Sequence, residues 1–241
     1  MRHALISDIH SNLEALTAVL ARIDASDDVG CLGDIVGYGP NPNECLALVR
    51  ERASGAVLGN HDLAALDNFG IEYFNEPARE ALEWTQTQLA PEHRAWLDSL
   101  GYELRMPGYL MVHGAPVDYF RYILDKRSAA IAFAATDAPL IFIGHSHIAE
   151  SYALGADGEV AHRHFQHGGT LALEVGVRYI VNAGSVGQPR DLNPAASYAT
   201  YDDAARTVAW ERVAYDVAAV QHKIAAAHLP EVLAARLVQG R

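Results

Sequence analysis

Acidic and histidine side chains recur along this chain at the ends of short apolar runs. With one amide among them, they are Asp8 and His10, Asp34, Asn60 and His61, His113, and His145 and His147. Carboxylate oxygens and imidazole nitrogens are ligands that borderline divalent metals such as manganese, iron and zinc accept. No cysteine accompanies them, which argues against a structural zinc site or an iron–sulfur cluster. These residues therefore indicate a metal site, and they are numerous enough for two ions.

Asp34 is the residue that could join two such ions, because a carboxylate can bridge. Two ions about 3.5–4 Å apart can clamp the attacking and leaving oxygens of a phosphoryl displacement. The chain is acidic: eighteen Lys and Arg against thirty Asp and Glu give a net charge of −12 with histidine counted neutral. Such a charge repels a phosphate backbone and argues against non-specific nucleic-acid binding. It would also repel a small phosphorylated substrate unless bound cations intervened locally.

Short apolar runs that are typical of buried strands lead into these polar residues. The runs are Ala4–Ile6, Val29–Leu32, Ala56–Leu58, Tyr109–Val112 and Leu140–Ile143. Helical patterns follow the first two runs, and the third ends at Gly59, which favours a tight turn. Because ligands bind at the carboxyl edge of an α/β sheet, we expect the polar residues to gather there. Ser11 and Glu14 predict a capping box at the start of the first helix.

The rest of the chain predicts a helical insertion, further strands and two final helices. The insertion covers residues 62 to about 107 and could border the site as a lid. From about residue 150 the apolar period changes to two, which predicts a β meander that forms a second sheet in the same domain. Its expected strands are 151–154, 160–165, 171–175, 179–181, 197–201 and 207–213. Alanine-rich helices at about 216–228 and 231–238 could pack on this single domain of residues 1–241 or join two copies as a homo-oligomer.

Three more histidines, His162, His164 and His167, lie close together around one of these strands. Their spacing resembles another metal cluster. Alternation within the strand and the turns beside it favour an exposed strand and loop instead, and we expect no metal there.

The cysteines and the N-terminus bear on the cellular compartment. Cys31 and Cys45 are the only cysteines, and both lie in apolar patterns, so we expect buried thiols and no disulfide. The first residues turn polar at Ser7 and Asp8, too early for a signal peptide. No apolar run approaches the length of a membrane span. These features predict a cytoplasmic protein that does not contact a membrane.

The order of the polar stretches resembles that of the calcineurin-like metallophosphoesterase family. The stretches are Asp8-x-His10, Gly33-Asp34, Gly59-Asn60-His61-Asp62, His113 and Gly144-His145-x-His147. The segment from Asn182 to Arg190 is also similar to the glycine-rich segment of the small bacterial members. Taken alone, each stretch could be a turn, a helix cap or a core histidine. If none of these stretches bound metal, separate explanations would have to produce, by coincidence, the order typical of one family. Metal binding is therefore the better interpretation.

The resemblance implies a ligand set for each of two divalent ions, with manganese first and iron, zinc, nickel or cobalt as alternatives. One ion would be held by Asp8, His10, Asp34 and His147, and the other by Asp34, Asn60, His113 and His145. His61, oriented by Asp62, would donate to the phosphate or protonate the leaving oxygen. A hydroxide between the ions would be the nucleophile. The implied fold is a four-layer α/β/β/α sandwich of two mixed sheets flanked by helices.

Three further residues could contact the substrate. Arg190 has a planar guanidinium that suits phosphate oxygens, and a surface salt bridge is nearly as good an explanation. Asn12 could donate to the substrate or only stabilise the first loop. Tyr38, with the aromatic stretch 119–122, could form a nucleoside-binding wall, and ordinary packing is the alternative.

The favoured function is a dinuclear-metal phosphoesterase acting on a small phosphodiester or phosphomonoester, preferably nucleotide-like. A phosphoprotein phosphatase is one alternative. Another is a non-catalytic interaction scaffold, which could lose the histidine of the Asn-His pair, whereas this chain keeps His61 and every ligand. A nuclease would need a basic groove, and the sequence has no stripe rich in lysine or arginine to form one.

Overall fold

Two mixed six-stranded sheets form the centre of the protein in the computed structural model, which describes residues 1–241. One sheet has the strand order β3-β2-β1-β11-β12-β9, and the other has the order β4-β5-β6-β10-β7-β8. The strands are β1 (Arg2–Ile6), β2 (Asp28–Cys31), β3 (Gly55–Ala56), β4 (Glu103–Met106), β5 (Tyr109–Val112), β6 (Leu140–Ile143), β7 (Ala149–Leu154), β8 (Val160–His164), β9 (Gly169–Ala172), β10 (Arg178–Ala183), β11 (Ala196–Asp202) and β12 (Thr207–Val213). The helices are α1 (Leu13–Leu20), α2 (Pro42–Arg52), α3 (Asn60–Asp67), the short 3₁₀ turn η1 (Ile71–Tyr73), α4 (Glu76–Gln88), α5 (Pro91–Asp98), α6 (Lys126–Ala134), α7 (Val217–Ala226) and α8 (Glu231–Gln239).

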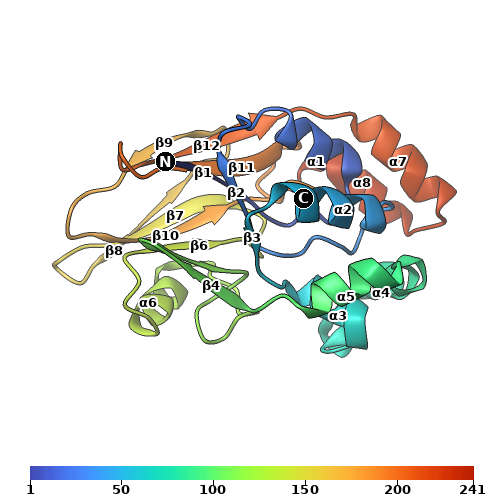
Figure 1. Ribbon diagram of the computed structural model, residues 1–241, viewed down its shortest axis with the longest axis horizontal. Helices are drawn as coiled ribbons and strands as arrows, with labels where there is room; N and C mark the ends of the chain where they lie inside the picture. Colours follow the sequence, from blue (N-terminus) through green and yellow to red (C-terminus); the bar gives the residue numbers. More distant parts are fainter.

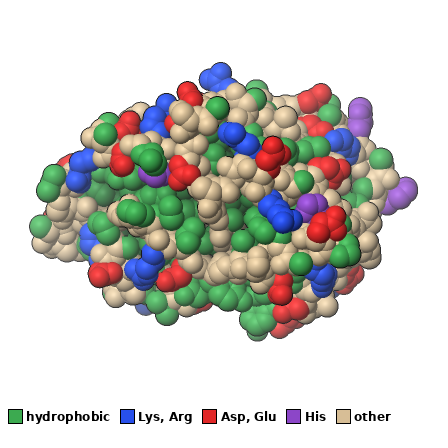
Figure 2. All heavy atoms as spheres, in the orientation of Figure 1, with side chains coloured by type: hydrophobic (Ala, Val, Ile, Leu, Met, Phe, Trp, Pro, Cys, Tyr) green, Lys and Arg blue, Asp and Glu red, His purple; other side chains and the backbone are tan.

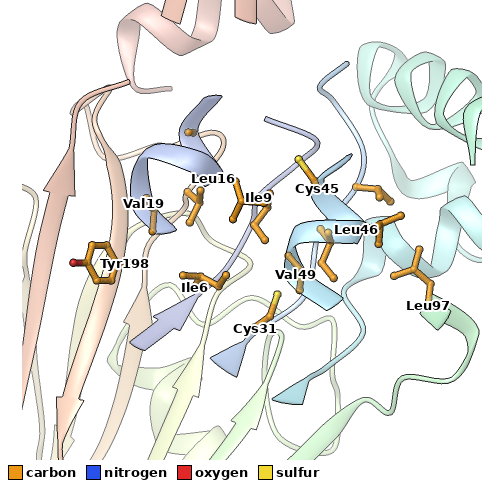
Figure 3. Packing of buried hydrophobic residues seen from close by; sticks show 14 of the residues in the cluster. Ile6, Ile9, Leu16, Val19, Cys31, Cys45, Leu46, Val49, Leu97 and Tyr198 are labelled. Atoms are coloured by element: carbon orange, nitrogen blue, oxygen red, sulfur yellow. The ribbon is translucent and has the colours of Figure 1, made fainter. Parts of the chain in front are cut away.

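The two sheets stack face to face, and helices cover the outer face of each. Leu5 of the first sheet and Phe142 of the second belong to the core between the sheets. On the outer face of the first sheet, Ile6 packs in one cluster with Leu16 of α1 and Leu46 of α2 (Figure 3). Helix α6 covers the outer face of the second sheet, where it stands apart from the other helices (Figure 1). The predicted four-layer α/β/β/α sandwich is confirmed.

The parallel strands explain why polar loops meet at one end of the sandwich. Strands β1, β2 and β3 are parallel in the first sheet, as are β5, β6 and β10 in the second. Their carboxyl ends therefore point the same way within each sheet. The carboxyl ends of the two sheets also meet across the sandwich. His145, in the loop that follows β6, donates its amide to the carboxylate of Asp8, in the loop that follows β1, at 3.0 Å.

The strands after residue 150 do not form a sheet of their own, and this part of the sequence prediction is wrong. Strands β7, β8 and β10 join the sheet of β4–β6, whereas β9, β11 and β12 join the sheet of β1–β3. Strand β10 lies between β6 and β7, and β11 pairs antiparallel with β1. Alternation shows which face of a strand is buried, but it does not identify the neighbouring strand.

The predicted helical insertion at 62–107 is helical over most of its length but has two different ends. Helix α3 begins earlier, at Asn60, so the Asn-His pair lies in the first helical turn. At the other end, residues 103–106 form strand β4, which pairs antiparallel with β5. Residues of this segment line a pocket described below, which agrees with the expected position beside the site.

Helix α1 is capped by Asn12 and not by the predicted Ser11–Glu14 capping box. Asn12 Oδ1 accepts a hydrogen bond from the Ala15 amide at 3.1 Å, and its Nδ2 donates to the Gly187 carbonyl at 2.9 Å. Ser11 has a φ of 55°, outside the extended conformation of an N-cap, and its hydroxyl has no partner. Both ends of the Asn12 amide are therefore used by the backbone, which supports its role in the turn over the alternative of substrate binding.

The two final helices pack on the domain that carries them. Val220 of α7 and Leu233 of α8 belong to one apolar cluster with Tyr38. Lys223 of α7 forms an ion pair with Glu14 of α1. These contacts agree with the packing interpretation of the helices.

The surface offers little support for binding to a polyanion on the face shown in Figure 2. Lysine and arginine side chains are scattered singly among acidic ones on this face, without a continuous basic stripe. The net charge of −12 also repels a polyanion. None of the helices combines the length and apolar character that crossing a membrane requires.

Candidate metal centre

The loops at the carboxyl ends of the parallel strands bring all the predicted ligands together. The ligands form two groups, and within each group all the ligand atoms lie within 4.8 Å of one another. Asp34 belongs to both groups. The groups are Asp8, His10, Asp34 and His147, and Asp34, His113 and His145. Every member is buried, with at most 4% of its surface exposed. Asn60 adjoins the second group, since its Oδ1 lies 3.1 Å from His113 Nε2.

Within each group the ligand atoms approach one another closely. His147 Nε2 lies 3.2 Å from Asp8 Oδ1 and 3.1 Å from His10 Nε2. Asp34 Oδ2 lies 3.7 Å from His10 Nε2 and 3.3 Å from His113 Nε2. His113 Nε2 is also 3.0 Å from His145 Nδ1. One carboxylate oxygen therefore faces both groups, which is the position that a bridging ligand needs.

Each of the four imidazoles is held by a backbone carbonyl on its outer side. The contacts are His10 Nδ1 to Val36 O at 3.1 Å, His113 Nδ1 to Leu32 O at 2.8 Å, His145 Nε2 to Phe120 O at 2.9 Å and His147 Nδ1 to Gln188 O at 2.6 Å. A carbonyl oxygen only accepts hydrogen bonds, so the ring nitrogen that faces it carries the hydrogen. The other nitrogen of a neutral ring then directs a lone pair inward, as metal-binding histidines do.

The close approach of two ring nitrogens fits a bound cation. Burial lowers the pKa of His10 to about 3 and holds that of His147 well below its usual range, so both rings are neutral. Their inward lone pairs face each other at 3.1 Å. Two lone pairs at this separation repel, and a cation among the ligands would remove the repulsion. The donor set of imidazoles and carboxylates is also the one that borderline divalent metals accept.

A proton occupies part of the second group when no cation is bound. Burial opposes the charged form of His113, but the Asp34 carboxylate outweighs it and raises the pKa of His113 to about 9. Burial also opposes the charge on Asp34, yet the positive charge of His113 and its hydrogen bond to the carboxylate hold the pKa of Asp34 well below the usual range. A metal ion binding here would therefore displace a proton from His113.

The ligand loops are strained, which is typical of functional sites. Positive φ angles occur at Asp8 (51°), His10 (48°), Asp34 (52°), His145 (67°) and His147 (62°). This conformation costs about 1–2 kcal/mol for each residue that is not glycine. Two glycines make room for the loops, because a Cβ atom on Gly59 would overlap the Asp34 carboxylate and one on Gly144 would overlap Asp8.

Asp62 was expected to orient the His61 ring, but its carboxylate oxygens are hydrogen-bonded to backbone amides instead. Its Oδ1 accepts from the amides of Ile35 at 2.9 Å and Val36 at 3.0 Å, and its Oδ2 accepts from the Gly59 amide at 3.1 Å. Burial raises the pKa of Asp62 to about 7, although the backbone amides oppose this shift. The carboxylate ties the Asp34 loop to the start of α3, so its role is structural.

His61 lies beside the first group of ligands with a free ring nitrogen. Its ring packs against His10, Tyr38 and Phe74 at centroid distances of 4.7, 4.5 and 4.7 Å. Nδ1 has no hydrogen-bond partner, and burial holds the pKa of His61 well below its usual range. The ring is therefore a neutral group fixed by aromatic contacts at the wall of a pocket.

A pocket of about 660 Å³ opens beside Asn60, His61 and His145. The predicted residues Tyr38 and Arg190 line it, together with the aromatic Phe120 and Tyr122. Of the expected aromatic wall, Tyr119 lies elsewhere and stacks on Tyr102 with ring centroids 5.3 Å apart. The segment 69–78, from the expected insertion, supplies further aromatic side chains.

Arg236 of α8 also lines this pocket, and the sequence analysis missed it. Its pKa is lowered by burial and by the nearby charge of Arg190. Arg190 Nη2 donates to Tyr38 Oη at 3.2 Å and to Gln188 Oε1 at 2.9 Å. Neither guanidinium forms an ion pair with a carboxylate. No sequence signal distinguishes Arg236 from the other arginines, because only the packing of α8 brings it to the pocket.

Several known proteins are similar to this chain in sequence or in fold. The family described as the calcineurin-like phosphoesterase superfamily domain matches residues 1–205. An uncharacterized protein of Methanocaldococcus jannaschii is 39% identical over 246 residues, which cover 99% of this chain and 98% of that protein. The crystal structure of a metallophosphoesterase from Sphaerobacter thermophilus is 43% identical, with a TM-score of 0.90 over 100% of both chains. A symmetrical bis(5'-nucleosyl)-tetraphosphatase of Stutzerimonas stutzeri is 46% identical over 66 residues, which cover 25% of this chain and 24% of that protein.

Proposed function

Because the chain belongs to the calcineurin-like phosphoesterase superfamily, we propose that it hydrolyses a small phosphate ester with the help of two divalent metal ions. The observation that carries this proposal is the inward convergence of four imidazole nitrogens on two carboxylates, with the Nε2 atoms of His10 and His147 only 3.1 Å apart. Asp8, His10, Asp34 and His147 would hold one ion, and Asp34, Asn60, His113 and His145 would hold the other. Bound ions supply Lewis-acid activation of a phosphoryl oxygen and of the attacking water, and manganese is our first choice.

The protein's own residues would bind the phosphate and stabilise the leaving oxygen. His61 is neutral and its ring lines the pocket. Its unpartnered Nδ1 is buried and faces Gly37, so Nε2 is the nitrogen that would donate a hydrogen bond to a phosphoryl or leaving oxygen. Because aromatic contacts fix the ring, little conformational entropy is lost when it engages the substrate.

The pocket favours a nucleotide-like substrate. Its volume of about 660 Å³ lies within the range typical of small-molecule sites, and aromatic rings line it. Arg190 and Arg236 are partly buried cations without carboxylate partners, so a phosphate group would satisfy both. Aromatic rings such as those of Tyr73 and Tyr122 offer faces on which a base can stack.

A paired substrate panel tests the proposal. Metal-free protein reconstituted with manganese is given bis-p-nitrophenyl phosphate, p-nitrophenyl phosphate and a set of adenine nucleotides, with an EDTA-treated sample beside each. We expect the wild-type protein to turn over substrate and EDTA to abolish this activity. Asp34→Asn, purified in the same way, should be inactive, which would exclude a contaminating phosphatase as the source of the activity. Preference for the diester would identify a phosphodiesterase, and preference for the monoester a phosphatase. Absence of turnover on the whole panel, with two ions bound, would contradict the proposal.

A further inference from the structure

A second cluster of metal-ligand side chains lies on β7 and β8, outside the candidate metal centre. It consists of Glu150, His162 and His164, whose ligand atoms all lie within 4.8 Å of one another. The sequence analysis expected these histidines to be exposed without a metal. The structure places His164 at the surface, but the side chain of His162 is only 18% exposed and faces Glu150. His167, the third histidine of that prediction, does not belong to the cluster.

The register of two antiparallel strands creates the cluster. Glu150 of β7 stands opposite His164 of β8, and Tyr152 stands opposite His162. Residues two apart share a face of the sheet, so the carboxylate meets both imidazoles on one side. Glu150 Oε2 lies 2.7 Å from His162 Nε2 and 3.6 Å from His164 Nδ1. The sequence could not reveal the glutamate, because its pairing with β8 depends on the register.

Glu150 is buried without enough partners. It is 1% exposed, and its Oε1 is buried without a hydrogen bond. A buried carboxylate with an orphaned oxygen is costly, because the desolvation of that oxygen is not repaid. Burial raises the pKa of Glu150 to about 7, and burial with the charge of Lys126 lowers the pKa of His162. The contact between Glu150 and His162 therefore still leaves Oε1 of the carboxylate without a partner.

We propose that Glu150, His162 and His164 bind a divalent transition-metal ion, such as zinc, at a site separate from the candidate metal centre. Two imidazoles and one carboxylate form a ligand set that such ions accept. His162 is held in place, because its ring stacks on Tyr152 with centroids 4.2 Å apart. The His164 side chain is 60% exposed and provides a route of entry from solvent.

The position of the site suggests a structural task. Strand β8 is the edge of its sheet, and β7 follows directly after the loop that carries His145 and His147. An ion shared by β7 and β8 would clip this edge strand to its neighbour. It would thereby stabilise the strand that supports the His145–His147 loop.

Metal counting distinguishes this site from the candidate metal centre. Full-length protein is stripped with EDTA, equilibrated with excess Zn²⁺, freed of weakly bound ions by gel filtration and analysed by mass spectrometry for zinc per chain. We expect His164→Ala to bind one ion fewer than wild type, whatever the wild-type total is. His167→Ala, a matched control in the same segment, should bind the same number as wild type. Protein loaded with Co²⁺ in place of Zn²⁺ should show an absorption band from the bound cobalt. In His164→Ala the absorbance per chain should fall by the contribution of one cobalt ion.

The result does not depend on phosphoesterase activity. His164 is largely exposed, so its replacement should not unfold the protein, and Glu150→Gln provides a second variant that preserves side-chain volume. Loss of one ion in both variants would support the proposal. Equal zinc content in wild type, His164→Ala and Glu150→Gln would overturn it. Failure of the dinuclear proposal would appear separately, as an unchanged zinc content in Asp34→Asn.

Discussion

Replacing Asp62 with asparagine tests whether this residue supports the backbone or orients His61. The carboxylate accepts hydrogen bonds from three amides, those of Ile35 and Val36 on Oδ1 and that of Gly59 on Oδ2. Asparagine has nearly the same shape and keeps one acceptor oxygen, so it can retain the first two bonds. Its NH₂ group would then face the Gly59 amide, donor against donor, in a fully buried position.

The loss of stability follows from these contacts. A hydrogen bond between neutral groups contributes about 0.5–1.5 kcal/mol, and an unsatisfied buried donor costs about 1–3 kcal/mol. One bond is lost, and the Gly59 amide and the asparagine NH₂ group are left facing each other without an acceptor, so we expect the free energy of unfolding to fall by about 3 kcal/mol. For a chain of this length each kcal/mol corresponds to about 2–4 °C, which predicts a decrease in Tm of about 6–12 °C.

Thermal unfolding followed by circular dichroism in EDTA measures this change without a contribution from bound metal. Asp67→Asn is the matched control, because Asp67 lies at the exposed end of the same helix and accepts one bond, from the Phe69 amide at 2.9 Å. We expect the control to change the free energy of unfolding by less than about 0.5 kcal/mol. A Tm for Asp62→Asn equal to that of wild type would refute the structural role. Reduced turnover at an unchanged Tm would instead restore the interpretation that Asp62 orients His61.

Four further substitutions examine the proposed site. Asp34→Asn should weaken the binding of both ions, whereas Asn60→Ala should weaken the binding of only one. Metal titration of each variant measures this, and loss of only one ion in Asp34→Asn would argue against a bridging role for Asp34. His61→Ala should retain both ions and lose about 10²–10⁴-fold in kcat, so unchanged turnover would remove His61 from the mechanism. Arg236→Met should raise KM for a nucleotide substrate about tenfold with little change in kcat, and an unaltered KM would exclude a phosphate contact.

Much of the candidate site could be predicted because its members occupy a local sequence position. Four of its members each lie shortly after an apolar run that forms a strand or ends one: Asp8, Asp34, His113 and His145. A short-range pattern therefore locates them, and parallel strands bring their ends to one edge of each sheet. The same reasoning fails for Asn12 and Asp62, whose partners are backbone groups of other segments. Stabilisation of the first loop was one of two alternatives for Asn12, whereas Asp62 was not expected to support the main chain.

The fold was predictable to the same extent. Alternation and helical periodicity located most strands and helices, since these patterns follow from the geometry of single segments. They did not show that β10 lies between β6 and β7, or that β9 and β12 leave the sheet of β7 and β8. Strand β4 was missed because a four-residue strand within a helical stretch leaves little periodic signal.

The sequence by itself therefore determined which side chains are candidate ligands, the order in which the strand ends present them and the family to which the chain belongs. Only the tertiary structure decided how the ligands point and what surrounds them. The carbonyls of Leu32 and Gln188 hold the rings of His113 and His147 from segments 81 and 41 residues away. Arg236 likewise reaches the pocket only because α8 packs beside Tyr38. These contacts join segments that are distant in the chain, and their geometry exists only when the sheets and helices have packed.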